Sequence, residues 1–223
     1  MPNSRTISLT AADGNSCAAY LAEPEGTPRG ALVIVQEVFG VNYHVRAVAD
    51  DYANRGYVAI SPSLFDRAQQ GVEMGYSDDE LARGRELRQA IGWDGPVADV
   101  KAAMEAVSRH GKVGVIGYCW GGSVAFLAAT RLDPACAVCY YGGQIAQFKD
   151  ETPNCPVMMH FGERDHIISE EDRKAILAAR PEAEAHVYPA GHGFNCTERA
   201  DYAPESAKLA LERTLAFLEK HVG

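Results

Sequence analysis

Short apolar runs alternate with longer amphipathic stretches along this chain of 223 residues. The apolar runs are rich in β-branched residues, which is typical of strands buried on both faces of a parallel sheet. They predict strands at 31–35, 57–60, 112–117, 137–141, 156–162 and 185–188. Apolar residues at helical spacing, with cap and stop signals around them, predict helices at 43–55, 97–109, 124–129, 169–179 and 204–221, besides one that begins at Ser77.

This alternation of strands and helices indicates an α/β fold, with a mostly parallel, doubly wound sheet and helices on both of its faces. Two earlier segments, 7–9 and 17–22, flank a turn and predict an N-terminal antiparallel hairpin. The segment 65–76 is polar and contains glycine, and a loop of this length suggests a functional role. Because no linker or repeat divides the chain, we expect residues 1–223 to form one domain.

The composition excludes several classes of partner. A formal net charge of −9 argues against nucleic acid and anionic membranes as partners. No apolar stretch approaches the length of a membrane-spanning helix, and the first residues lack the apolar core of a signal peptide. We therefore expect a cytoplasmic protein, monomeric or homodimeric, that acts on a small molecule without a cofactor or a metal.

The six cysteines are scattered along the chain, unlike the cysteines of a disulfide framework. Cys136 and Cys139 form a C-x-x-C pair, but no second pair and no histidine at metal spacing accompany them. We interpret them as strand residues of a reduced protein.

The predicted strand at 112–117 leads directly into Gly117-Tyr118-Cys119-Trp120-Gly121, and a helix follows. A strand, a sharp turn and a helix in this order form the nucleophile elbow of α/β-hydrolases. The two glycines fit this interpretation, because a side chain at either position would collide across so tight a turn. Cys119 stands at the apex, where most elbows carry serine.

Two plainer interpretations compete for this segment. A dinucleotide-binding loop is excluded, since Gly114, Gly117 and Gly121 do not follow the G-x-G-x-x-G spacing. A lone cysteine in such a turn could also be an ordinary small buried residue. The second interpretation weakens because partners for a nucleophile follow later in the chain.

Asp165 and His192 each follow a separate predicted strand, as Cys119 does. Such positions converge at the carboxyl edge of a parallel sheet, and the order nucleophile, acid, histidine is that of α/β-hydrolases. A thiol has an ordinary pKa near 8.5 and needs a base at neutral pH. His192 can accept its proton, and Asp165 can orient the imidazole. A helix cap and a turn residue are the alternatives, but position, order and spacing together favour catalysis.

The remaining histidines carry no such pattern. His160 lies within an apolar strand, which favours a structural role. The others have no motif context and are also interpreted as structural, namely His44, His110, His166, His186 and His221.

Glu37 places a carboxylate at the end of a central, otherwise apolar strand. It could be a loop acid that points to solvent. If it lies beside Cys119, its charge competes for the thiol proton and for His192. The backbone N–H groups of Val38 and Trp120 are the natural donors of an oxyanion hole.

With these residues in place, the sequence resembles the dienelactone hydrolase (carboxymethylenebutenolidase) family over nearly its whole length. Four motifs carry the resemblance: QEVFGVN at 36–42, GYCWGG at 117–122, GERDH at 162–166 and GHGF at 191–194. Four ordered motifs of this kind rarely arise together by chance.

The resemblance implies an α/β-hydrolase that cleaves a lactone or an enol ester through a triad of Cys119, His192 and Asp165. It also implies that Glu37 pairs with the thiol in the resting enzyme and yields when substrate enters. The thiolate would attack the carbonyl, the enolate would leave, and water would cleave the thioester.

The chain departs from the family at the arginines that hold the carboxylate of the ring-cleavage dienelactone. Cys196 stands where one of them is expected, and Leu81 at the place of the other, with Arg83 and Arg85 nearby. A neutral cysteine cannot replace a bidentate arginine–carboxylate contact. An uncharged or differently held lactone or ester is therefore an equal expectation. Its pocket would be lined by Phe39, Trp120 and Phe194.

Two further hypotheses remain at this stage. One is a general carboxylesterase that acts on activated esters. The other is a non-catalytic, redox-responsive thiol protein on the same fold.

Overall fold

An eight-stranded sheet forms the centre of the protein in the computed structural model, which describes residues 2–223. Its order is β1-β2-β4-β3-β5-β6-β7-β8. The strands are β1 (Asn3–Thr10), β2 (Ser16–Glu23), β3 (Gly30–Val35), β4 (Tyr57–Pro62), β5 (Val113–Tyr118), β6 (Cys136–Tyr140), β7 (Val157–Gly162) and β8 (Glu184–Tyr188). β2 pairs antiparallel with β1 and β4, and the other neighbours are parallel. The predicted hairpin and the mostly parallel sheet are confirmed.

Five strands that follow one another across the sheet are buried along their whole length, namely β4, β3, β5, β6 and β7. Helices cover both of their faces, so nearly every position of these strands carries an apolar side chain or glycine, with Ser61 and His160 as buried polar exceptions. This explains why they read as continuous apolar runs, whereas the edge strand β8 is largely half-buried or exposed. Cys136 and Cys139 belong to β6 and are buried free thiols, as expected.

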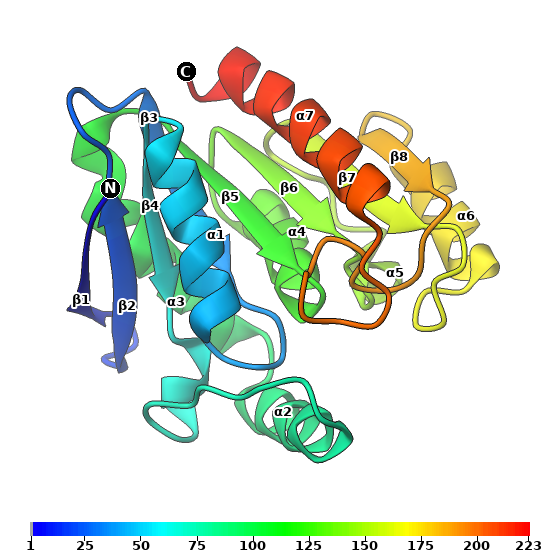
Figure 1. The fold of residues 1–223 in the computed structure, drawn as a ribbon, viewed down its shortest axis with the longest axis horizontal. Helices are drawn as coiled ribbons and strands as arrows, with labels where there is room; N and C mark the ends of the chain where they lie inside the picture. The colour runs from blue at the N-terminus through cyan, green and yellow to red at the C-terminus, as the bar shows by residue number, and fades with distance from the viewer. Residues whose placement is uncertain (1) are drawn as a thin grey trace.

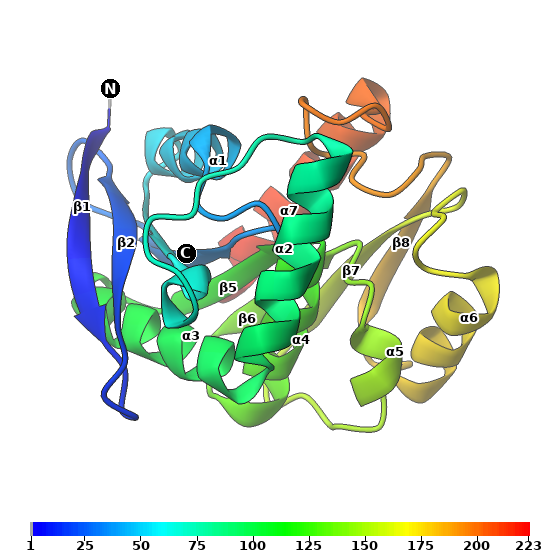
Figure 2. The same cartoon turned by 90° about the horizontal axis from the view of Figure 1, so that it is seen from below.

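Helices lie on both faces of the sheet, as Figures 1 and 2 show. α1 and α7 cover one face, and α3, α4 and α6 cover the other. The helices are α1 (Tyr43–Asn54), α2 (Asp78–Ile91), α3 (Asp94–Val107), α4 (Trp120–Arg131), α5 (Ile145–Phe148), α6 (Glu170–Ala179) and α7 (Pro204–His221).

α2 differs from the others because it lies across the carboxyl edge of the sheet (Figure 2). Ser77 and Glu80 form a capping box at its start, and Gly92, with φ of 63°, ends it. At Gly84 the helix approaches the loop after β3 so closely that a Cβ would lie 1.9 Å from the carbonyl oxygen of Val38. The helix is therefore packed directly against the loop that carries Glu37 and Val38.

Two helix starts and the loop 65–76 are among the places where the structure differs from the sequence prediction. α3 begins at Asp94 rather than at 97, because Pro96 is tolerated in a first turn, where its missing N–H has no helical partner. α4 begins directly after Cys119 and is longer than the predicted segment 124–129. The loop 65–76 is partly ordered by a 3₁₀ turn (Leu64–Arg67) and by a bridge between Gly40 and Glu73.

Arg67, at the end of the 3₁₀ turn, joins three distant segments. Its guanidinium donates to both carboxylate oxygens of Asp99 on α3, at 2.7 and 2.8 Å. It also donates to Asp13 in the hairpin turn, at 2.7 Å. The side chain of Asp99 is fully buried, and Asn15 donates to it as well. This network fixes the start of the loop 65–76 against the body of the protein.

We predict that Asp99→Ala lowers the free energy of unfolding by about 3 kcal/mol, because it leaves the partly buried guanidinium of Arg67 without its buried carboxylate partner. Asp13→Ala, which removes an exposed partner of the same arginine, should cost less than about 1 kcal/mol. Urea denaturation of the two variants measures the difference. Equal and small losses would show that Asp99 does not anchor this segment.

Candidate active site

Cys119 stands alone at the junction of β5 and α4, with φ of 55° and ψ of −122°. A positive φ is costly for a residue with a side chain, so the surrounding packing must hold this backbone in place. A Cβ at Gly117 would lie 1.8 Å from the carbonyl oxygen of Gly121, and one at Gly121 would lie 2.4 Å from that of Gln36. Glycine at both positions therefore permits the sharp turn that the sequence predicted.

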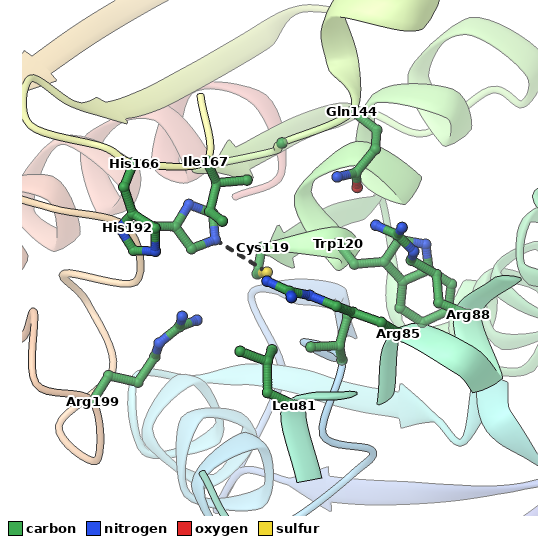
Figure 3. Close-up of a pocket in the computed structure, with 12 residues that line it drawn as sticks. Leu81, Arg85, Arg88, Cys119, Trp120, Gln144, His166, Ile167, His192 and Arg199 are labelled. Carbon is green, nitrogen blue, oxygen red and sulfur yellow. Dashed lines mark hydrogen bonds between the residues drawn. The ribbon is translucent and has the colours of Figure 1, made fainter. Parts of the chain in front are cut away.

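The structure brings Cys119, His192 and Asp165 together from three separate loops. Nε2 of His192 lies 3.2 Å from Sγ of Cys119 (Figure 3), and its Nδ1 lies 2.8 Å from Oδ2 of Asp165. The backbone N–H groups of Ile167 and Ile168 donate to Oδ1 of Asp165, at 2.7 and 2.9 Å. The imidazole is almost fully buried. This chain of hydrogen bonds fixes the orientation of the ring toward the sulfur.

The charges of these groups favour a thiolate beside an imidazolium. Burial alone would raise the pKa of the Cys119 thiol, but the charge and the hydrogen bond of His192 outweigh it and lower that pKa. Burial opposes the protonation of His192, yet Cys119 and Asp165 raise its pKa to about 10. Burial raises the pKa of each of the other five cysteines. Cys119 is thus the cysteine disposed to react near neutral pH.

The backbone N–H groups of Val38 and Trp120 belong to the two loops that flank this sulfur. Among residues 2–223, neither group donates to another backbone carbonyl. Trp120 is the first residue of α4, where the helix leaves its N–H groups without partners. Both N–H groups are therefore free to donate hydrogen bonds to an oxygen that develops negative charge.

Glu37 is buried, with 1% of its surface exposed, so it does not point to solvent. The resemblance implied a contact between Glu37 and the thiol, but the structure pairs Glu37 with Arg199 instead, at 3.3 Å between Oε1 and Nη1. Oε2 has no hydrogen-bond partner in the described chain. A nearby guanidinium stabilises a buried carboxylate better than a thiol does, which explains the pairing.

A cavity of about 450 Å³, including its open mouth, leads to Sγ of Cys119. Figure 3 shows its walls, with His166, Ile167 and Arg199 on the side of His192, and Arg88 and Gln144 on the other. The lining residues are Val38, Leu81, Arg85, Arg88, Cys119, Trp120, Gly143, Gln144, His166, Ile167, His192 and Arg199.

The expected substrate-binding residues separate into two groups. Trp120 and Arg85 line the cavity. Arg83 lies outside it, where it contacts Glu86 and Gln69. The other three lie outside the cavity lining because they pack beneath its surface, each at most 2% exposed, namely Phe39, Phe194 and Cys196. Phe39 still contributes indirectly, since the guanidinium of Arg199 lies 5.8 Å from the centre of its ring.

Arg88, Arg199 and His166 line the cavity, although the sequence did not single them out for it. The sequence favours a structural role for His166, but its ring centre lies 6.1 Å from that of His192. Arg199 lies three residues beyond Cys196, where an arginine was missing, and it is the only arginine between 189 and 203. An isolated arginine so close to the GHGF motif is a sequence signal that could have identified Arg199 as a residue of the cavity wall.

The fold and this site define the chain as an α/β-hydrolase-type enzyme, and the comparisons with known proteins specify it further. The model of the dienelactone hydrolase family matches residues 17–222, so the chain belongs to that family. It is 34% identical to a carboxymethylenebutenolidase of Pseudomonas putida over 224 residues, which cover 95% of this chain and 94% of the relative. The family identifies it as a hydrolase of lactones or esters.

Two further comparisons agree. A carboxymethylenebutenolidase of Pseudomonas sp. (strain P51) is 32% identical over 226 residues, covering 96% of this chain and 94% of the relative. The crystal structure described as "Putative Dienelactone Hydrolase from Klebsiella pneumoniae subsp. pneumoniae MGH 78578" superposes with a TM-score of 0.81. It is 29% identical and covers 96% of this chain and 98% of its own.

Neither a membrane-spanning helix nor a metal cluster is found in the part of the chain that the structure describes. No helix within residues 2–223 is long and apolar enough to cross a bilayer. The same residues contain no group of three or more side chains suited to hold a metal ion.

We predict that Asp165→Asn raises the pKa of the Cys119 thiol, because it removes the charge that stabilises the imidazolium of His192. The rate of iodoacetamide alkylation against pH gives this pKa directly. In the unchanged protein its midpoint should lie below the ordinary value of a thiol. The activity of the variant should be at least 10²-fold lower than that of the unchanged protein. The activity of the unchanged protein should decline as the pH rises through about 10, because His192 then loses its proton.

Asp201→Asn provides the matched control. Asp201 lies 4.0 Å from the exposed His166 and does not bond to His192. Its loss should leave the alkylation midpoint unchanged. A midpoint that does not move in Asp165→Asn either would contradict the role of the Asp165–His192 hydrogen bond.

Proposed function

We propose that this protein is a cysteine-dependent hydrolase of lactones and enol esters that works through a thioester intermediate. The observation that carries the proposal is the contact of 3.2 Å between Sγ of Cys119 and Nε2 of His192, with Asp165 bonded behind the ring. A sulfur held in this way, at the end of a cavity, has the geometry of an activated nucleophile. The activity is that of the family, and the mechanism is our own assignment to these residues.

The reaction proceeds in two halves. Sγ of Cys119 attacks the carbonyl carbon, and the resulting oxyanion accepts hydrogen bonds from the N–H groups of Val38 and Trp120. When the carbonyl reforms, the carbon–oxygen bond to the leaving group breaks, and that oxygen takes the proton from His192. His192 then removes a proton from water, whose oxygen attacks the thioester and releases the acid and the thiol.

A thiolate nucleophile restricts the range of leaving groups. The tetrahedral intermediate can expel either the sulfur or the oxygen of the substrate, and the weaker base leaves more readily. An enolate or a phenolate competes well with a thiolate, whereas a simple alkoxide does not. Enol lactones and aryl esters should therefore be good substrates, and alkyl esters and amides poor ones.

The cavity also favours an acidic substrate. Arg85 and Arg88 line it without an ion-pair partner, although the chain as a whole has a net charge of −9. Clusters of one charge in a cleft attract ligands of the opposite charge. The absence of an arginine at 196 therefore does not leave the cavity uncharged, because cations from other positions supply its charge.

We predict that Cys119→Ala abolishes turnover of an enol lactone while the protein remains folded. Mass spectrometry of the unchanged enzyme, mixed with a slow substrate and quenched, should find one acyl group on Cys119. Cys155→Ala, which removes a half-buried cysteine beside β7, should keep full activity. Undiminished turnover in Cys119→Ala would exclude the mechanism, and selective alkylation without turnover of any ester or lactone would indicate a redox-responsive thiol instead.

The same enzyme preparation separates a lactonase from a general carboxylesterase. Enol lactones and 4-nitrophenyl esters are compared by kcat/KM. Both proposals share the nucleophile and differ in the substrate that the cavity accepts, so a lactonase should have the higher kcat/KM for the lactones. A higher value for the 4-nitrophenyl esters would instead favour the general carboxylesterase of activated esters.

A further inference from the structure

Arg85 and Arg88 are the arginines for which the structure shows no partner. Every other arginine of the chain has an ion pair, a hydrogen bond or a ring contact. Both unpartnered side chains line the cavity above Cys119. In an acidic protein, two cations without a counter-charge at one cavity favour the binding of an anion there.

The helix that carries them does not neutralise them. Arg85 and Arg88 stand three positions apart on α2, so their like charges are neighbours and slightly destabilise the helix. The acids close to them are used elsewhere: Glu80 caps the helix at Ser77, and Glu86 pairs with Arg83. The sequence thus keeps an unfavourable pair of charges on the face that meets the cavity.

Two polar groups in the same wall also lack partners. Nε1 of Trp120 is a buried donor without a hydrogen-bond acceptor, and Oε1 of Gln144 is a buried acceptor without a donor. Both residues line the cavity, and Trp120 is only 1% exposed. If the amide of Gln144 turns by 180°, it presents its NH₂ group instead of its oxygen. This wall can then supply two neutral donor groups, the amide NH₂ and the indole N–H, besides the two guanidinium groups.

The reaction fixes which part of a substrate faces this wall. The leaving oxygen must lie near Nε2 of His192, because that atom protonates it. The carbonyl oxygen must lie between the N–H groups of Val38 and Trp120. In Figure 3, Arg88 and Gln144 lie on the other side of the sulfur from His192. The remaining substituent of the carbonyl carbon, the acyl chain, therefore extends toward this side.

We propose that Arg85 and Arg88 form an anion subsite that binds a carboxylate on the acyl side of the substrate, away from the leaving oxygen. This inference rests on the proposed thioester mechanism and adds the substrate class to it: lactones or enol esters of acids that carry a second carboxylate. Arg199 does not belong to this subsite, because Glu37 already balances its charge from the opposite wall.

Three esters test the proposal. The mono-4-nitrophenyl ester of adipic acid carries its carboxylate on the acyl side. 4-Nitrophenyl hexanoate has the same chain length without the charge, and 4-carboxyphenyl hexanoate carries the charge on the leaving group. We expect the unchanged enzyme to have a higher kcat/KM for the adipate ester than for the nitrophenyl hexanoate. In the double variant Arg85→Gln, Arg88→Gln this ratio should fall about 10- to 100-fold, the size of a charge-assisted contact.

Arg83→Gln is the matched control, because it removes one charge from the same helix but lies outside the cavity. It should leave the ratio unchanged, and the double variant Arg85→Lys, Arg88→Lys should keep part of the preference. Each single glutamine variant gives the same readout if the double variant folds poorly.

A constant ratio in the glutamine variants would overturn the proposal, and so would a loss confined to 4-carboxyphenyl hexanoate. Cys119→Ala removes turnover of all three esters, so failure of the mechanism and failure of the subsite give different results.

Discussion

The contact between Sγ of Cys119 and Nε2 of His192 is the interaction on which the chemistry of this protein depends. Burial by itself makes both charged forms unfavourable, since it raises the pKa of the thiol and lowers that of the imidazole. Only their proximity, with Asp165 behind the ring, reverses both effects. The backbone at Cys119 is held at a positive φ to make that contact, and the packing around two glycines stabilises this conformation.

The rest of the fold serves this contact by bringing loops to one edge. β5 delivers the cysteine, β7 the aspartate and β8 the histidine, and all three are parallel neighbours or near neighbours in the sheet. α2 covers the edge and presses on Val38 through Gly84, so the loop with an oxyanion donor is supported from outside. A sheet of short apolar strands thus positions polar groups that come from residues far apart in the sequence.

Charge is distributed unevenly around this edge. A buried carboxylate, Glu37, sits close enough to raise the pKa of the Cys119 thiol, and Arg199 acts in the opposite direction. Their pairing balances the two effects near the sulfur. Arg85 and Arg88 stand on the other wall without such a balance, and this difference is the basis of the acyl-side subsite that we propose.

The sequence alone determined the sheet, most helices and the elbow, because each depends on neighbouring residues: continuous apolar runs, caps such as Ser77, and glycines spaced for a tight turn. It also placed Cys119, Asp165 and His192 at strand ends, which the parallel sheet then brought together. It did not determine the pairing of Glu37 with Arg199, or the choice of Arg88 rather than Arg83 for the cavity wall. Those depend on the path of the loop after β8 and on the rotation of α2 about its axis. Both are decided by packing between segments that are distant in the chain, such as the contact of Gly84 with Val38, and no local pattern encodes that packing.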